Sequence, residues 1–78
     1  MSDPVNHPRH YRQGDIECID AIKSAVTGAP PFEAVCVANV LKYVWRYRAK
    51  NGLNDLHKAR WYLGTLIAAV EEREGEGR

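Results

Sequence analysis

Apolar residues recur at three- and four-residue spacing in three parts of the chain, which is the pattern of amphipathic helices. The first part starts at Asp15, a residue type that can cap a helix, and it ends before a Gly- and Pro-containing segment at residues 27–31. Its apolar positions are Ile16, Ile19, Ile22 and Val26. We therefore predict a short first helix directly after Gly14.

The second part begins near Pro31, which suits the first turn of a helix, and runs to about Lys50. From Ala34 to Leu41 the one polar residue is Asn39. The run at 35–40 also fits a strand, but its length and its Ala, Leu, Lys and Arg content favour a helix. A helix that is apolar nearly all round is buried on more than one side. We expect a second copy of the chain to cover part of it.

A third helix is predicted after Asn54, which can cap it. Its apolar stripe consists of Leu56, Ala59, Leu63, Leu66, Ile67 and Val70. The fold class is therefore all-α. We expect a small three-helix domain over residues 15–72, an extended N-terminal arm over residues 1–14 that contributes to the site, and a frayed acidic tail over residues 73–78. We expect oligomerisation to complete this domain.

Composition limits the protein class. A chain of 78 residues forms one domain, and such a domain buries only about 60% of its unfolded surface. Cys18 and Cys36 lie in apolar stretches, so we expect small buried thiols and no disulfide. No secretory signal and no membrane-spanning run is evident, so we expect a cytoplasmic protein. Oligomerisation then becomes the expected source of additional buried surface.

Positive charge gathers in the middle of the chain, although the net charge is only +1. Between residues 42 and 60 six Lys and Arg residues accompany a single acid, Asp55, while four glutamates lie between residues 71 and 76. This distribution points to an anionic partner, and the alternative is a solvated helix face.

Four polar or aromatic residues share one face of the second helix. They are Asn39, Lys42, Tyr43 and Arg46, at i, i+3, i+4 and i+7. Arg can hold a phosphate through two parallel hydrogen bonds, and Lys acts as a point charge. We therefore predict a site for a phosphorylated small molecule. The alternative is that Asn39 bonds a neighbouring helix and both cations are solvated.

A matching line on the third helix contains Asp55, Lys58 and Tyr62. Asp55 falls in the first turn, where a carboxylate stabilises the helix dipole. The alternative is that Asp55 orients Lys58 or Arg46, or accepts a hydrogen bond from a sugar or base.

The N-terminal arm adds His7, His10 and Tyr11, of which His10 and Tyr11 can close over a ligand. Two histidines are too few for a metal site, so we expect no bound metal. No phosphate-binding loop of the Gly-x-x-x-x-Gly-Lys type occurs. Trp45, Arg48 and Trp61 could form a nucleic-acid surface, but tryptophans at helical spacing are more often core or interface anchors. Nucleic acid is therefore not the expected partner.

Four segments, in order, carry a family resemblance: VNHPRHY at 5–11, GDIECID at 14–20, NVLKYVWRY at 39–47 and KNGLNDLHKARWYL at 50–63. They resemble a small phage family known as the SaV-like domain of unknown function, often labelled nucleotide kinase. The resemblance covers about residues 5 to 70.

The resemblance implies a phage-encoded nucleotide-binding protein that acts in the bacterial host cell and forms a homo-oligomer. It also implies a nucleoside monophosphate kinase without a P-loop, which takes a nucleoside triphosphate as phosphate donor. The alternatives are a non-catalytic protein that sequesters a nucleotide or nucleotide signal, and a module that binds a host protein. The ligand-binding residues are expected to be His7, His10, Tyr11, Asn39, Lys42, Tyr43, Arg46, Asp55 and Lys58.

Overall fold

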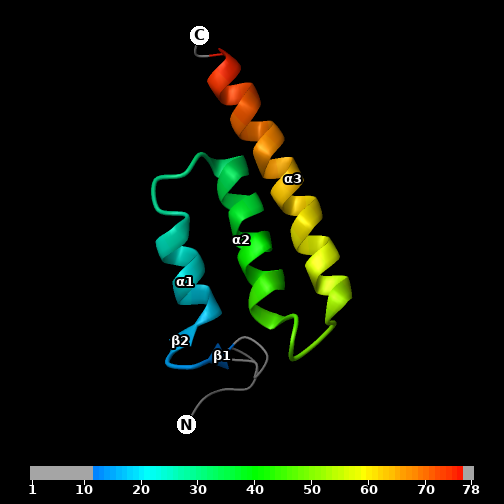
Figure 1. Cartoon of the computed structure of the whole chain (residues 1–78). Coiled ribbons are helices and arrows are strands. Elements are labelled where there is room, and N and C mark those ends of the chain that lie inside the picture. The colour runs from blue at the N-terminus through cyan, green and yellow to red at the C-terminus, as the bar shows by residue number, and fades with distance from the viewer. Residues whose placement is uncertain (1–11, 77–78) are drawn as a thin grey trace.

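The computed structural model describes residues 12–76, which form a short hairpin followed by three helices (Figure 1). The elements are β1 (Arg12–Gln13), β2 (Ile16–Glu17), α1 (Cys18–Ala25), α2 (Pro31–Arg46) and α3 (Leu53–Glu76). The predicted all-α fold is confirmed, because the two strands are only two residues long each. His7, His10 and Tyr11 lie outside the described residues.

A hairpin, and not the start of a helix, precedes α1. The strands β1 and β2 pair antiparallel. Gly14 takes a φ of 63°, as the first position of a II′ hairpin turn requires, and Asp15 lies exposed beside it. The expectation that Asp15 caps the first helix is therefore wrong. That helix begins at Cys18, with Glu17 at the N-cap position.

The second helix begins at Pro31, as predicted, but ends at Arg46 and not near Lys50. The chain then turns through residues 47–52, where the amide of Gly52 donates a 2.7 Å hydrogen bond to the carbonyl of Tyr47. This closed turn reverses the chain, so α3 runs back along α2.

The third helix begins at Leu53, so Asn54 lies inside its first turn and does not cap it. The amides of Asp55 and Leu56 instead donate to the carbonyl of Gly52. The helix continues to Glu76, beyond the point where the apolar pattern fades. No helix among the described residues combines the length and the apolarity needed to cross a membrane.

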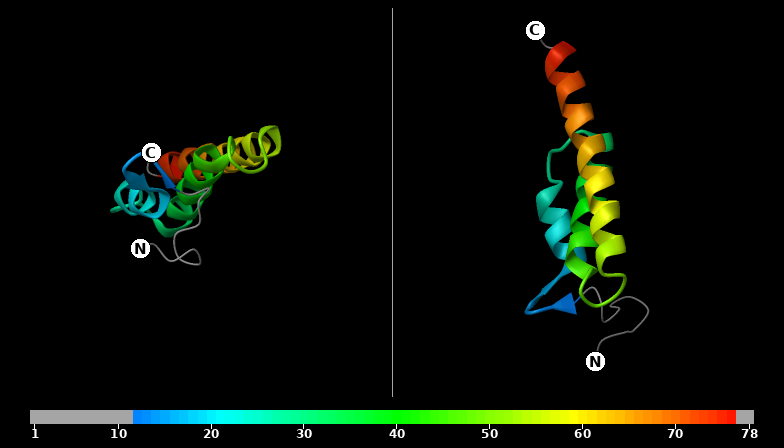
Figure 2. Two further views of the ribbon diagram at one scale, coloured as in Figure 1. Left: turned by 90° about the horizontal axis from the view of Figure 1, so that it is seen from below. Right: turned by 45° about the vertical axis from the view of Figure 1, so that its right-hand side comes forward.

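The helices alternate in direction, with α2 between α1 and α3 (Figures 1 and 2). The C-terminal part of α3 projects past the start of α2. Among the described side chains the buried apolar core consists of Cys18, Cys36 and Ala59. Both cysteines are buried and unbonded, as expected. The apolar segment of α2 stays partly open, since Val35 is 52% exposed.

Candidate functional site

Two tyrosines face one another where α2 and α3 pack together. Tyr43 of α2 and Tyr62 of α3 are stacked, with ring centroids 5.9 Å apart and planes inclined by 22°. Trp61 meets the ring of Tyr62 edge-on at 4.9 Å. Both tyrosines are half-buried, so their rings take part in the helix packing and still reach the surface.

Three cationic side chains surround the ring of Tyr43. The Lys42 ammonium lies 4.5 Å from the ring centroid, the Arg46 guanidinium 4.9 Å and the Lys58 ammonium 5.5 Å. These distances allow cation–π attraction. We call this group the Tyr43 cluster, and its members are Lys42, Tyr43, Arg46, Lys58 and Tyr62. The two helix faces that the sequence singled out therefore meet in space.

Arg46 and Asp55 form a buried ion pair inside this cluster. The Arg46 Nε lies 3.2 Å from Oδ2 of Asp55, and one terminal nitrogen lies 3.3 Å from Oδ1. Their relative exposures are 7% and 0%. Asn51 donates two further hydrogen bonds to the same carboxylate, from its backbone amide and from its side-chain amide. Asp55 lies in the first turn of α3, as the sequence predicts, and it also makes the predicted contact with Arg46.

The environment of Asp55 favours its charged form. Burial by itself raises the pKa of this carboxyl, but hydrogen bonds from Arg46 and Asn51, together with the charge of Arg46, outweigh burial. The pKa of Asp55 therefore lies below its usual value. The carboxylate thus stays ionised and is fully engaged in joining α2, the 47–52 turn and α3.

Asn39 lies one turn before Lys42 and Tyr43 and is half-buried. Its side-chain amide donates a 2.9 Å hydrogen bond to the carbonyl of Val35 in its own helix. An amide in an apolar segment needs a hydrogen-bond partner, and the backbone of α2 itself supplies this one, where the alternative interpretation of the sequence had a neighbouring helix.

The charge of Lys42 also affects the thiol of Cys18 at the start of α1. Burial raises the pKa of the Cys18 thiol, and the positive charge of Lys42 only partly offsets this effect. A thiol with a raised pKa is a poor nucleophile. The structure therefore gives no support to cysteine chemistry at this end of α1.

Two residues of the site, Asn51 and Tyr62, were not among the ligand-binding residues predicted from the sequence. Asn51 nevertheless donates two hydrogen bonds to the carboxylate of Asp55 four residues later. Tyr62 stood on the line of Asp55 and Lys58 but was not counted as a ligand-binding residue. Its spacing from Lys58 was the available signal. Nothing in the sequence marked Asn51 as a carboxylate ligand, because its role depends on the turn.

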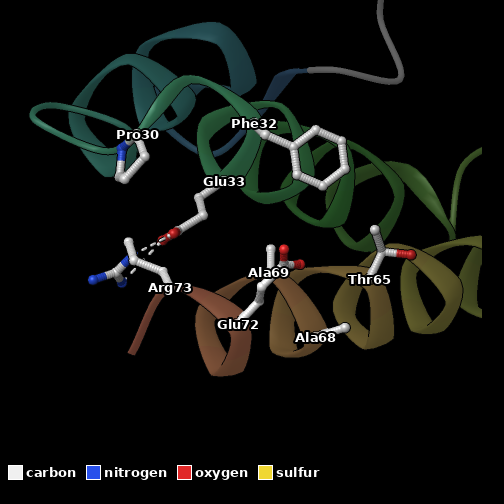
Figure 3. Close-up of a pocket in the computed structure, with 8 residues that line it drawn as sticks. All are labelled: Pro30, Phe32, Glu33, Thr65, Ala68, Ala69, Glu72 and Arg73. Atoms are coloured by element: carbon white, nitrogen blue, oxygen red, sulfur yellow. Dashed lines mark hydrogen bonds and ion pairs between the residues drawn. The ribbon is translucent and has the colours of Figure 1, made fainter. Parts of the chain in front are cut away.

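A separate apolar groove lies at the opposite end of α2 (Figure 3). It has a volume of about 360 Å³ and lies between the start of α2 and the second half of α3. Arg73 and Glu33 pair across it at 2.6 Å. The lining includes the aromatic ring of Phe32 and the carboxylate of Glu72. This groove does not resemble an anion site, because its one cation is already paired with a carboxylate.

Residues 5–64 match a family of proteins of unknown function designated DUF3310. The chain belongs to the DUF3310 family. The match includes every predicted ligand-binding residue from His7 to Lys58, and it ends in the middle of α3. No curated protein and no solved structure matches the chain. Within residues 12–76 no group of three or more potential metal ligands occurs in this DUF3310 domain.

Proposed function

We propose that this protein binds a phosphorylated small molecule, and specifically a nucleotide, at the Tyr43 cluster. The observation that carries the proposal is the convergence of Lys42, Arg46 and Lys58 on one aromatic ring. Asp55 is the single acid in the sequence between residues 42 and 60, and it offsets one of these three charges. An anion that reaches the cluster would relieve the remaining repulsion.

The members of the cluster have different roles in this proposal. Lys42 and Lys58 approach from α2 and α3 and would bind phosphate oxygens from two sides. Arg46 is held by Asp55, so it contributes fixed positive charge and orients the ring of Tyr43. Tyr62 and Trp61 offer aromatic surface on which a base would stack. His7, His10, Tyr11 and Asn39 complete the proposed site.

The family resemblance extends this proposal to a phage-encoded protein that acts in the cytoplasm of the bacterial host. In its catalytic form the protein transfers a phosphoryl group from a nucleoside triphosphate to a monophosphate. Such a reaction depends mainly on positioning and charge neutralisation, which Lys42 and Lys58 would provide.

A second candidate function is sequestration of a nucleotide without turnover. The state of Asp55 favours it, because four hydrogen bonds and a lowered pKa leave this carboxylate poorly suited to act as a general base. Sequestration needs the same cluster but no second site for a phosphate donor.

Titration calorimetry and a turnover assay with the full chain distinguish these functions. The ligands are nucleoside monophosphates, nucleoside triphosphates and inorganic phosphate. Formation of a nucleoside diphosphate supports the kinase, and stoichiometric binding without turnover supports sequestration. If no nucleotide binds, the proposal is wrong and the remaining alternative is a module that binds a host protein.

A further inference from the structure

The outer face of α3 carries large apolar side chains that are exposed to solvent. Trp61 is 66% exposed, Leu63 45% and Ile67 51%. The opposite face of the helix packs on α2, where Ala59 is buried and Tyr62 is half-buried. Figure 2 shows that α3 forms one side of the molecule. Leu63 and Ile67 lie one turn apart and form an exposed apolar stripe, and Trp61 adds apolar surface on the adjacent side of the helix. Exposed apolar surface of this kind marks an interaction site.

Gly64 lies at the centre of this stripe. Glycine in a helix interior is destabilising relative to alanine, so its presence needs a reason. A Cβ atom at this position would meet no other atom within 4 Å, so contacts in the described chain do not explain the glycine. The close approach of a second helix backbone is a physical reason for a small residue here.

Charges of opposite sign flank the apolar stripe. Arg60 precedes Leu63, and Glu71 follows Ile67, and both charged residues are exposed. Arg60 makes a 3.0 Å contact with His57, while Glu71 forms no ion pair in the part of the chain that the structure describes. The outer face of α3 is therefore basic at one end and acidic at the other. Its charges are complementary to those of the same face on a second, antiparallel copy of the helix.

We propose that this face docks a second copy of the chain, with the two α3 helices antiparallel about a two-fold axis level with residues 65 and 66. A two-fold axis makes each contact occur twice, because the same surface serves both partners. The axis sets three residues of one copy opposite three of the other: Arg60 opposite Glu71, Leu63 opposite Ala68 and Gly64 opposite Ile67. Gly64 of one copy leaves space for the side chain of Ile67 of the other, and Arg60 forms an ion pair with Glu71 across the interface.

Charge reversal tests the proposed register. We expect sedimentation of the full chain at micromolar concentration to show a dimer or a larger even-numbered assembly. Arg60→Glu places like charges opposite each other twice, and should raise the dissociation constant at least about tenfold. Glu71→Arg should do the same. Combining both substitutions restores opposite charges and should restore assembly.

Restored assembly in the double variant would require contact between Arg60 and Glu71 positions of two different copies. Arg60 and Glu71 are eleven positions apart on the helix, or about 16.5 Å along its axis, so neither can compensate for the other within one chain. Arg48→Glu is the matched control, because Arg48 is exposed in the 47–52 turn and lies outside the proposed interface. This variant should assemble like the wild type.

Gly64→Leu adds a test of close approach. The leucine finds open space in a single copy, so circular dichroism should show an unchanged helix content, but it should block the proposed contact and weaken assembly. A monomeric wild-type protein would overturn the proposal, and so would binding of lipid vesicles by that monomer. Assembly that both Arg60→Glu and Gly64→Leu leave intact would also overturn it, and would indicate an interface elsewhere, such as the face with Phe32.

Discussion

Tyr43 is the residue on which the positive side chains of α2 and α3 converge. All three cations lie within 5.5 Å of the centroid of its ring, which attracts each of them, and Tyr62 stacks on the ring from the other helix. Each of the three cations has a different environment. Arg46 is buried and paired with Asp55, Lys42 is half-buried, and Lys58 is exposed. Substitution of each should therefore have a different effect.

Lys42→Ala should weaken nucleotide binding while leaving the fold intact. A charge-assisted hydrogen bond contributes roughly 1.5–3 kcal/mol, so we expect about a tenfold to hundredfold loss of affinity. Arg48→Ala is the control, since Arg48 lies in the 47–52 turn and lines a different cavity, outside the Tyr43 cluster. Calorimetry with a nucleoside monophosphate measures both variants. Equal losses would indicate a diffuse basic surface in place of a defined site.

Arg46→Ala should unfold the protein more readily, because it leaves the carboxylate of Asp55 buried without its counterion. Removing one partner of a buried ion pair costs about 3–5 kcal/mol. Urea denaturation monitored by circular dichroism measures the loss. Arg73→Ala provides the comparison, because the Arg73 side chain is 52% exposed and its removal should cost much less. Similar losses for both variants would contradict the structural role of the buried pair.

Asp55 should also make the protein sensitive to acid. Its pKa is lower in the folded state than in the unfolded state, where an aspartate titrates at about 3.9. The unfolded state therefore takes up the proton first as the pH falls. Stability from this group is complete above the unfolded pKa and is lost as the pH falls towards the folded pKa.

The free energy of unfolding, measured from neutral pH down to about pH 3, tests this dependence. Asp55→Asn removes the titrating group, so this variant should be less stable near neutral pH but should lose less stability on acidification. A variant with the same pH dependence as the wild type would show that other carboxyl groups cause the acid sensitivity.

At the scale of elements, hydrophobic periodicity was enough to predict three helices and the start of α2 at Pro31. It missed the β1–β2 hairpin, because a strand of two residues has no detectable period. Asp15 looks like a helix cap in sequence, yet a Gly-Asp pair also forms a hairpin turn. The residue types at 14 and 15 fit either a helix cap or a hairpin turn, and the pairing of β1 with β2 decides in favour of the turn.

Helix ends were predicted less well than helices. Residues up to Lys50 favour a helix, but α2 stops at Arg46 because the chain must turn before Gly52 for α3 to pack back on α2. Asn54 is a good capping residue by type, yet the carbonyl of Gly52 already accepts the first hydrogen bonds of α3. Tertiary packing sets both of these boundaries.

Gly52→Ala tests the importance of this turn. Gly52 has a φ of 53°, a left-handed conformation that costs a residue with a Cβ roughly 1–2 kcal/mol. The turn also places Asn51 against Asp55, so strain here should disturb the buried pair as well. Gly75→Ala is the control, because Gly75 lies within α3 in open space. Thermal denaturation should show a lower midpoint for Gly52→Ala and no loss for Gly75→Ala.

At the scale of the whole molecule, the candidate site arises from two helix faces that periodicity identified separately. The Asn39–Arg46 face follows from spacing on α2, and the line of Asp55, Lys58 and Tyr62 follows from spacing on α3. The sequence could not reveal that Tyr43 and Tyr62 stack, because that contact depends on how α3 is aligned along α2. It also could not show that Arg46 is committed to Asp55.

Because the Tyr43 cluster draws on both α2 and α3, a bound nucleotide should stabilise the whole fold. A ligand at one hundred times its dissociation constant adds about 2.7 kcal/mol to the unfolding free energy. Each kcal/mol raises the melting temperature of a domain this small by roughly 4–8 °C. A nucleoside monophosphate should therefore raise the melting temperature by about 10 °C or more.

Two controls distinguish this effect from general charge screening. Sodium chloride at the same ionic strength reproduces the screening but offers no phosphate, so it should give a much smaller shift. Lys58→Ala removes the cation that α3 contributes while leaving the buried pair of Arg46 and Asp55 in place. This variant should melt like the wild type without ligand but gain little from the nucleotide. A full shift in Lys58→Ala would place the bound nucleotide outside the Tyr43 cluster and contradict the proposed site.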